Sequence, residues 1–166
     1  MLYTYLNPIL QFGWEAFHRD AEAAGVDGLL ILDLPPDEET TAVAGDLFHI
    51  RLVAPTSSPE RIARIAKAAR GFIYYVSREG VTGARANVES SIADRLAIIR
   101  AQTELPIAVG FGISTPAQAA EIAQVADGVV VGSAIVQQIA DHAGKVDLAK
   151  RITDFVRPLV DATKTR

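Results

Sequence analysis

Short apolar runs and helical stretches alternate along this chain, and the alternation restricts the possible folds more than any other feature. The stretches between the runs carry apolar residues three and four positions apart, as amphipathic helices do. An order of strand and helix repeated six times predicts parallel strands joined by crossover helices. The runs have the length and β-branched content of buried strands and lie at Leu2–Tyr5, Gly28–Leu32, Ile50–Ala54, Phe72–Val76, Ile107–Val109 and Val129–Val131.

The residues expected at helix ends agree with this alternation of strands and helices. Ser58 stands before Pro59, which predicts a capped helix with proline at its first position, and Ser114-Thr115-Pro116 repeats the arrangement. A final helix is expected over Asp147–Thr163, where Pro158 should kink or shorten it.

The positions of the glycines distinguish an open sheet from a barrel. A dinucleotide-binding sheet has a glycine-rich turn after its first strand, but here Leu6-Asn7-Pro8 follows that strand. The glycines follow the last two strands instead, as Gly110-Phe111-Gly112 and Gly132-Ser133. Barrels hold phosphate at those loops. We therefore predict an α/β protein of the (β/α)8 TIM-barrel family, with about six βα units in one domain over residues 1–166 and hence an incomplete barrel.

A phosphate group requires converging backbone N–H donors and the positive end of a helix dipole. Gly112 allows close approach of the backbone, and Gly132 can begin a short helix to which Ser133 adds a hydroxyl donor. Gly83, after the fourth strand, could supply a further N–H group. Alternatively, these glycines only serve tight turns between strands and helices.

Composition excludes several classes of function. The net charge is -4, and the 16 Lys and Arg residues are scattered, which argues against nucleic acid as a partner. Without cysteine there is no thiolate metal site, and the three histidines lack ligand spacing, so we expect no metal. No run approaches the roughly 20 apolar residues of a membrane span, and the first residues do not resemble a signal peptide. A cytoplasmic location is the expectation.

An ordered set of motifs spans the chain. It resembles the tryptophan synthase alpha subunit family over nearly its whole length. Single motifs recur in other phosphate-binding barrels, but their order is specific. The motifs are Tyr5-Leu6-Asn7-Pro8-Ile9, Gly25-Val26-Asp27-Gly28, Asp33-Leu34-Pro35-Pro36, Ala54-Pro55-Thr56, Gly71 to Ser77, Gly80-Val81-Thr82-Gly83, Val109 to Ser114 and Asp127 to Ala134.

The resemblance implies a lyase of tryptophan biosynthesis, which cleaves indole-3-glycerol phosphate to indole and glyceraldehyde 3-phosphate. It also implies a partner, the beta subunit, which receives the indole. Pyridoxal phosphate belongs to that partner, so no cofactor is expected on this chain.

The resemblance further assigns roles to matching positions. Two of these residues could instead have purely structural roles: Tyr74 could be an ordinary core aromatic, and Asp33 could be a turn residue. The implied phosphate ligands are Gly83, Gly112, Gly132 and Ser133; the implied substrate contacts are Leu30, Tyr74, Thr82 and Phe111; and Asn7, Asp33 and Pro35 are expected to face the beta subunit.

The matched motifs begin at the family's third strand. Its general acid–base Glu and its catalytic Asp lie before that point, so the resemblance assigns no catalytic residue here and implies that these 166 residues are inactive alone. The first and last strands, Leu2–Tyr5 and Val129–Val131, should be unpaired edges that allow self-association.

Two alternatives to a lyase stay open. One is a non-catalytic module that binds phosphate or the beta subunit. The other is a different phosphate-sugar barrel enzyme, an isomerase or epimerase, for which Asp33 and Glu79 are the candidate acids.

Overall fold

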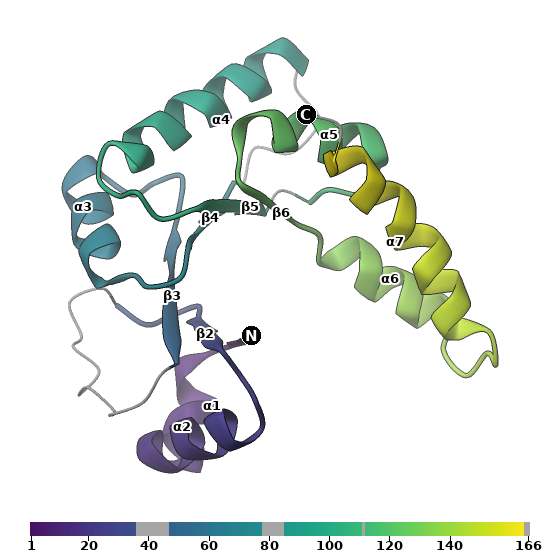
Figure 1. The fold of residues 1–166 in the computed structure, drawn as a ribbon, viewed down its shortest axis with the longest axis horizontal. Helices are drawn as coiled ribbons and strands as arrows, with labels where there is room; N and C mark the ends of the chain where they lie inside the picture. The colour runs from purple at the N-terminus through teal and green to yellow at the C-terminus, as the bar shows by residue number, and fades with distance from the viewer. Residues whose placement is uncertain (36–46, 78–84, 111, 165–166) are drawn as a thin grey trace. The chain divides into compact units, whose positions relative to one another are not determined.

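A computed structural model describes residues 1–35, 47–77, 85–110 and 112–164. In these residues six strands lie in the order β1-β2-β3-β4-β5-β6, which is also their order in the chain (Figure 1). Parallel registers join β1 to β2, β2 to β3, and β5 to β6. The strands are β1 Leu2–Thr4, β2 Gly28–Ile31, β3 Phe48–Val53, β4 Ile73–Val76, β5 Ile107–Gly110 and β6 Gly128–Val130.

All six predicted strands are confirmed, with ends that shift by one or two residues. The described helices are α1 Leu6–Phe12, α2 Trp14–Ala23, α3 Pro59–Ala68, α4 Arg85–Arg100, α5 Pro116–Val125, α6 Ser133–Asp141 and α7 Leu148–Lys164. The sequence did not predict α1. Its N-cap residue, Tyr5, makes no side-chain cap, so the usual local signal for a helix start is missing.

The predicted caps are confirmed. The Ser58 hydroxyl accepts the Arg61 N–H at the start of α3. Thr115 forms a capping box with Gln118 at the start of α5. Pro158 does not shorten α7, which continues to Lys164, so that part of the expectation was wrong.

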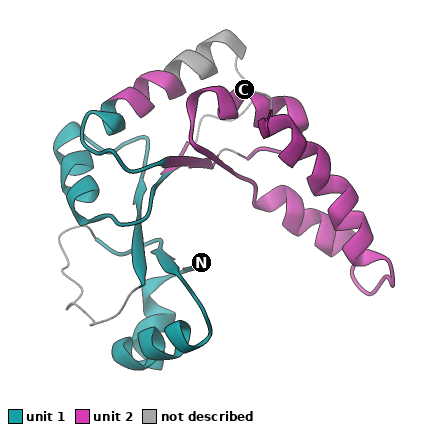
Figure 2. Cartoon of the chain, viewed as in Figure 1, with its two compact units in different colours: residues 1–74, 98–106 teal, residues 75–97, 107–166 magenta. Residues whose placement is uncertain are grey.

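The chain divides into two compact units, coloured separately in Figure 2. Unit 1 comprises residues 1–74 and 98–106, and unit 2 comprises residues 75–97 and 107–166. Each is described below by itself, and the prediction of a single domain stays a prediction.

In unit 1, α1 and α2 pack on one face of β2. Leu29 and Ile31 point to this face, where they form a buried cluster with Ile9 and Ala21. Because side chains alternate along a strand, Leu30 lies on the opposite face and is 1% exposed.

In unit 2, α5 packs against both β6 and α7. Ile107 and Val109 of β5 are fully buried, as is Ala119 of α5. Leu159 is the buried residue of α7. This small core fixes the strand ends that carry the predicted phosphate ligands.

Candidate functional site

The carboxyl ends of β5 and β6 lie next to each other. Gly110 pairs with Val130 in a parallel register. Gly112 and Gly132 each follow two residues later. Because adjacent strands are about 4.8 Å apart, the two glycine-bearing loops leave the sheet side by side, as the sequence predicted.

Gly112 adopts a left-handed backbone, with φ of 57°. A side chain is disfavoured in this conformation, so turn geometry alone accounts for the glycine. A Cβ at this position would meet no atom of the described structure within 4 Å. The turn interpretation therefore holds for Gly112, and open space beside it also leaves room for a ligand.

Gly132 is different, because its backbone is not left-handed and packing does not explain the glycine. Its φ is -114°, which other residues adopt, and a Cβ would meet nothing within 4 Å. The Gly132 carbonyl accepts the N–H groups of Ile135 and Val136 and so begins α6. Glycine is therefore suited to a close approach from outside the chain.

The start of α6 is a suitable environment for an anion. No acidic residue lies in its first turn, and no side chain caps it. Among the described residues, the N–H groups of Ser133 and Ala134 have no acceptor. Ser133 is exposed, so its hydroxyl can add a further donor. Free N–H groups and the helix dipole together favour a phosphate.

Two predicted substrate contacts lie in unit 1. Leu30 pairs in register with Tyr3 on one side and Ile50 on the other, so these three residues share one face of the sheet. The Tyr74 ring contacts the Tyr3 ring edge to face, with centroids 6.4 Å apart. The arrangement is an apolar, aromatic cluster in which Tyr3 is the exposed member.

Tyr74 is 8% exposed, so its interpretation as a core aromatic stays open. Burial, and next the neighbouring Tyr3, raise the pKa of the Tyr74 hydroxyl. The group is therefore neutral near pH 7 and can donate a hydrogen bond.

Two of the predicted partner-facing residues, Asn7 and Asp33, lie close together. The Asp33 carboxylate, in the turn after β2, accepts the backbone N–H of Leu6 at 2.7 Å. Asn7 is the next residue of α1 and is exposed, while Pro35 is partly exposed. Asp33 thus has a structural role at the start of α1, consistent with the alternative interpretation as a turn residue.

Several predicted positions lie outside the described residues. These are Thr82, Gly83, Phe111 and the candidate acid Glu79. The structure therefore places Gly112, Gly132 and Ser133 in unit 2, and Leu30, Tyr74, Asn7, Asp33 and Pro35 in unit 1.

Sequence reasoning missed a polar group on β3. His49 Nε2 lies 3.2 Å from His18 Nε2, and His18 Nδ1 lies 2.8 Å from the Trp14 carbonyl oxygen. In a neutral His18 the Nδ1–H donates to that carbonyl, so Nε2 accepts the hydrogen that His49 Nε2 carries. Burial lowers the pKa of His49 to about 4, with smaller effects from His18 and Arg51, so His49 is neutral at pH 7.

Arg51 was also missed, although a charged residue inside the apolar run Ile50–Ala54 was a signal. It is 8% exposed.

In the part of the chain that the structure describes, no three acidic, histidine or cysteine side chains gather as metal ligands. No described helix is long and apolar enough to cross a membrane.

Parallel strands in chain order, joined by helices, define an α/β protein of the (β/α)8-barrel class. More specifically, the chain belongs to the tryptophan synthase alpha chain family, whose model matches residues 1–164.

Individual relatives agree with the family. The tryptophan synthase alpha chain of Pelobacter propionicus is 48% identical over 166 residues, which are 98% of this chain and 62% of the relative. That of Gloeobacter violaceus is 50% identical over 170 residues, 99% of this chain and 61% of the relative. The chain therefore spans about three-fifths of the length of these relatives.

Solved structures show the same fold. A tryptophan synthase of Mycobacterium tuberculosis superposes with a TM-score of 0.84 at 40% identity. The match covers 99% of this chain and 62% of the Mycobacterium tuberculosis chain. A chain of the tryptophan synthase a2b2 complex of Pyrococcus furiosus superposes with a TM-score of 0.84 at 34% identity. This match covers 96% of the present chain and 66% of the Pyrococcus furiosus chain.

Proposed function

We propose that residues 1–166 supply the phosphate-binding and indole-binding part of a cytoplasmic lyase that cleaves indole-3-glycerol phosphate to indole and glyceraldehyde 3-phosphate. Family membership supports this reaction. The observation that carries the binding role is the pair of loops after β5 and β6, where Gly132 begins α6 and has open space beside it.

The binding residues divide by chemistry. Gly112, Gly132 and Ser133 offer backbone N–H groups and one hydroxyl to the phosphate, while Gly83 and Thr82, outside the described residues, stay the predicted phosphate and substrate contacts. Tyr74 and Phe111 are proposed to line the indole end, with the buried Leu30 behind them. Such groups hold and orient a substrate, which lowers the entropic part of the barrier.

Cleavage also needs proton transfers: a base at the indole nitrogen and an acid at the ring carbon that carries the glycerol chain. The family's Glu and Asp have no matching position here. The 166 residues alone are therefore proposed to bind substrate without efficient turnover.

Glycerol phosphate tests the phosphate site. It should raise the melting temperature of the parent chain through ligand linkage. Gly132→Asp should abolish the shift, because the new carboxylate repels the anion and its Cβ occupies the approach. Gly132→Ala is the matched control: it adds a Cβ without charge and should keep a reduced shift.

Equal shifts in the parent and in Gly132→Asp would place the anion elsewhere and refute the proposed phosphate site at Gly112, Gly132 and Ser133. A parent chain that shows no shift would also count against it.

A second function, binding of the tryptophan synthase beta subunit, is favoured by the bond that brings Asp33 beside Asn7. Pull-down of a beta subunit by the parent chain tests it. Asn7→Asp should weaken capture by introducing an unpaired charge at the interface, whereas Gln138→Glu on α6 should not. No capture by the parent removes this function.

The isomerase or epimerase alternative has less support. The Asp33 carboxylate is occupied by the Leu6 N–H, and Glu79 lies outside the described residues. Self-association through the edges of β1 and β6 stays a prediction, which size-exclusion chromatography tests directly.

A further inference from the structure

Arg51 is a buried charge without a partner among the described residues. It lies on β3 and is 8% exposed. Its Nε and Nη1 atoms are buried and make no hydrogen bond within the described parts of the chain. An unpaired buried guanidinium is costly, since it loses water without gaining an acceptor. A residue of this kind suggests that an acceptor comes from elsewhere.

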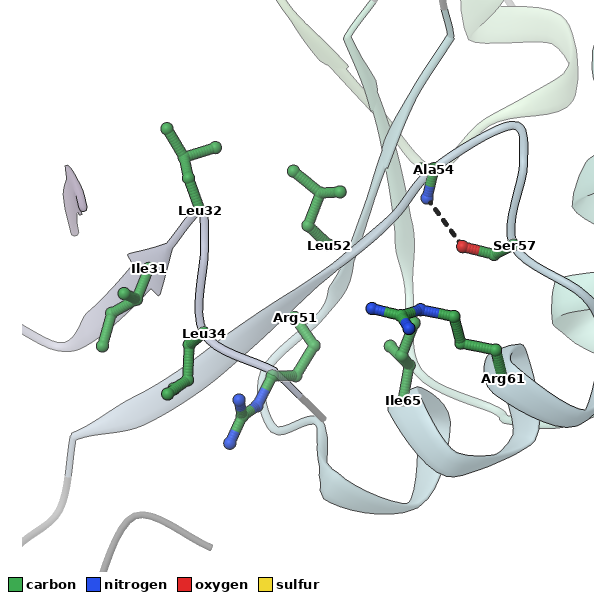
Figure 3. Close-up of a pocket in the computed structure, with 9 residues that line it drawn as sticks. All are labelled: Ile31, Leu32, Leu34, Arg51, Leu52, Ala54, Ser57, Arg61 and Ile65. Atoms are coloured by element: carbon green, nitrogen blue, oxygen red, sulfur yellow. Dashed lines mark hydrogen bonds between the residues drawn. The ribbon is translucent and has the colours of Figure 1, made fainter. Parts of the chain in front are cut away.

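A pocket beside Arg51 could receive that acceptor. Figure 3 shows Arg51 extending from β3 and Arg61 from α3, with Ser57 at the loop between them. The Ser57 oxygen accepts the Ala54 N–H at 3.2 Å, which leaves the Ser57 hydroxyl hydrogen available to donate. Ser57 itself is 6% exposed. The side chains of Arg51, Arg61 and Ser57 can therefore each donate a hydrogen bond into the pocket.

The charge in the pocket is one-sided. Among the described residues that line it, two carry guanidinium groups and none carries a carboxylate. Its remaining walls include Leu32, Leu52 and Ile65. Apolar walls strengthen attraction between a guanidinium and an anion because they exclude water. Arginine also presents forked N–H groups that match the oxygens of carboxylate or phosphate.

The size of the pocket restricts its ligand. Its volume is about 80 Å³, which suits a group of a few heavy atoms rather than a nucleotide or a sugar phosphate. We propose that this pocket binds a small oxyanion, an inorganic phosphate or a short carboxylate, between Arg51, Arg61 and Ser57. The site lies in unit 1, so it is distinct from the glycine loops of unit 2 and does not depend on the proposed lyase function.

The test is a titration of the chain with inorganic phosphate, and separately with acetate, followed by amide NMR. The amides of Ser57 and Arg61 report on this pocket, and that of Ser133 reports on the loops of unit 2. One or both anions should shift the unit 1 amides at saturable concentrations. Phosphate alone would identify a phosphate site, and acetate alone a carboxylate site.

Variants separate the two anion sites. Arg51→Met should remove the response of Ser57 while leaving that of Ser133, and it should not destabilise the chain, because it replaces an unpaired buried charge with an apolar side chain. Arg61→Gln, at an exposed position, should weaken binding about tenfold or more, as expected for loss of a charge-assisted hydrogen bond. Arg64→Gln, on the same helix but outside the pocket, should bind as the parent does.

Three results would overturn the proposal. The first is a response at Ser133 with none at Ser57 for either anion. The second is parent-like binding by both Arg51→Met and Arg61→Gln. The third is strong destabilisation by Arg51→Met, which would show that the charge is already paired within the chain.

Discussion

The Asp33 carboxylate accepts the backbone N–H of Leu6 at 2.7 Å across 27 residues of sequence. The bond joins the turn after β2 to the first residue of α1, the helix that follows β1. It supplies the helix start with an acceptor that Tyr5, the N-cap residue, does not provide. One side chain thus fixes the position of α1 and of the neighbouring Asn7.

Removing this acceptor should destabilise the protein. We expect Asp33→Ala to lower the free energy of unfolding by about 1–2 kcal/mol, as for loss of a helix cap. Asp33→Asn keeps an oxygen acceptor and should lose less. Urea unfolding measures both. Asp20→Ala, which removes an exposed ion pair with Arg19, should change little. An Asp33→Ala variant as stable as the parent would show that the bond does not hold α1.

The His18–His49 pair should make stability depend on pH. The pKa of His49 is about 4 in the folded chain, against an ordinary value of 6.5. Between these values the unfolded state binds a proton that the folded state does not, so stability falls as the pH falls. The contribution is fully present above about pH 6.5 and is lost toward pH 4.

Urea unfolding at pH 7.5 and pH 5 checks this expectation. The parent should be less stable at pH 5, and His49→Gln should show a smaller difference between the two pH values. His142→Gln, a matched histidine change on another element, should behave as the parent does. If His49→Gln retains the full difference, the pH dependence arises from other groups.

Pro158 lies inside α7 at an exposed position. Proline has no N–H to donate to the helix and crowds the preceding turn. We therefore expect Pro158→Ala to raise the free energy of unfolding by about 1 kcal/mol or more. Arg157→Ala, its exposed neighbour, should have little effect. An unchanged or lower melting temperature in Pro158→Ala would indicate that the packing of the helix depends on the proline.

Measuring indole release tests the proposal that these residues bind the substrate but do not cleave it efficiently. With indole-3-glycerol phosphate, the 166-residue chain should turn over far below about 1 s⁻¹, an ordinary enzyme rate, if it lacks the family's acid and base as proposed. Heat-inactivated chain gives the background rate. Turnover near 1 s⁻¹ or above would show that other residues of this chain perform the proton transfers.

Local patterns in the sequence determined the six strands, the caps at Ser58 and Thr115, and the glycines after β5 and β6. Each depends on residues within a few positions of one another, where periodicity and capping act directly. The strand parallelism also followed, because a helix between two strands leaves few other arrangements. The family resemblance rested on the same local motifs and is confirmed.

Only the tertiary structure decided which distant side chains meet. Asp33 meets Leu6, and His49 meets His18, because strand register and helix packing place them together. The same packing buries Arg51 beside Ser57 and Arg61. Sequence showed Arg51 as a charge within an apolar run but gave no partner for it. Burial and pairing are sums over residues far apart in the chain, so the environment of a charged group emerges only once the strands and helices have packed.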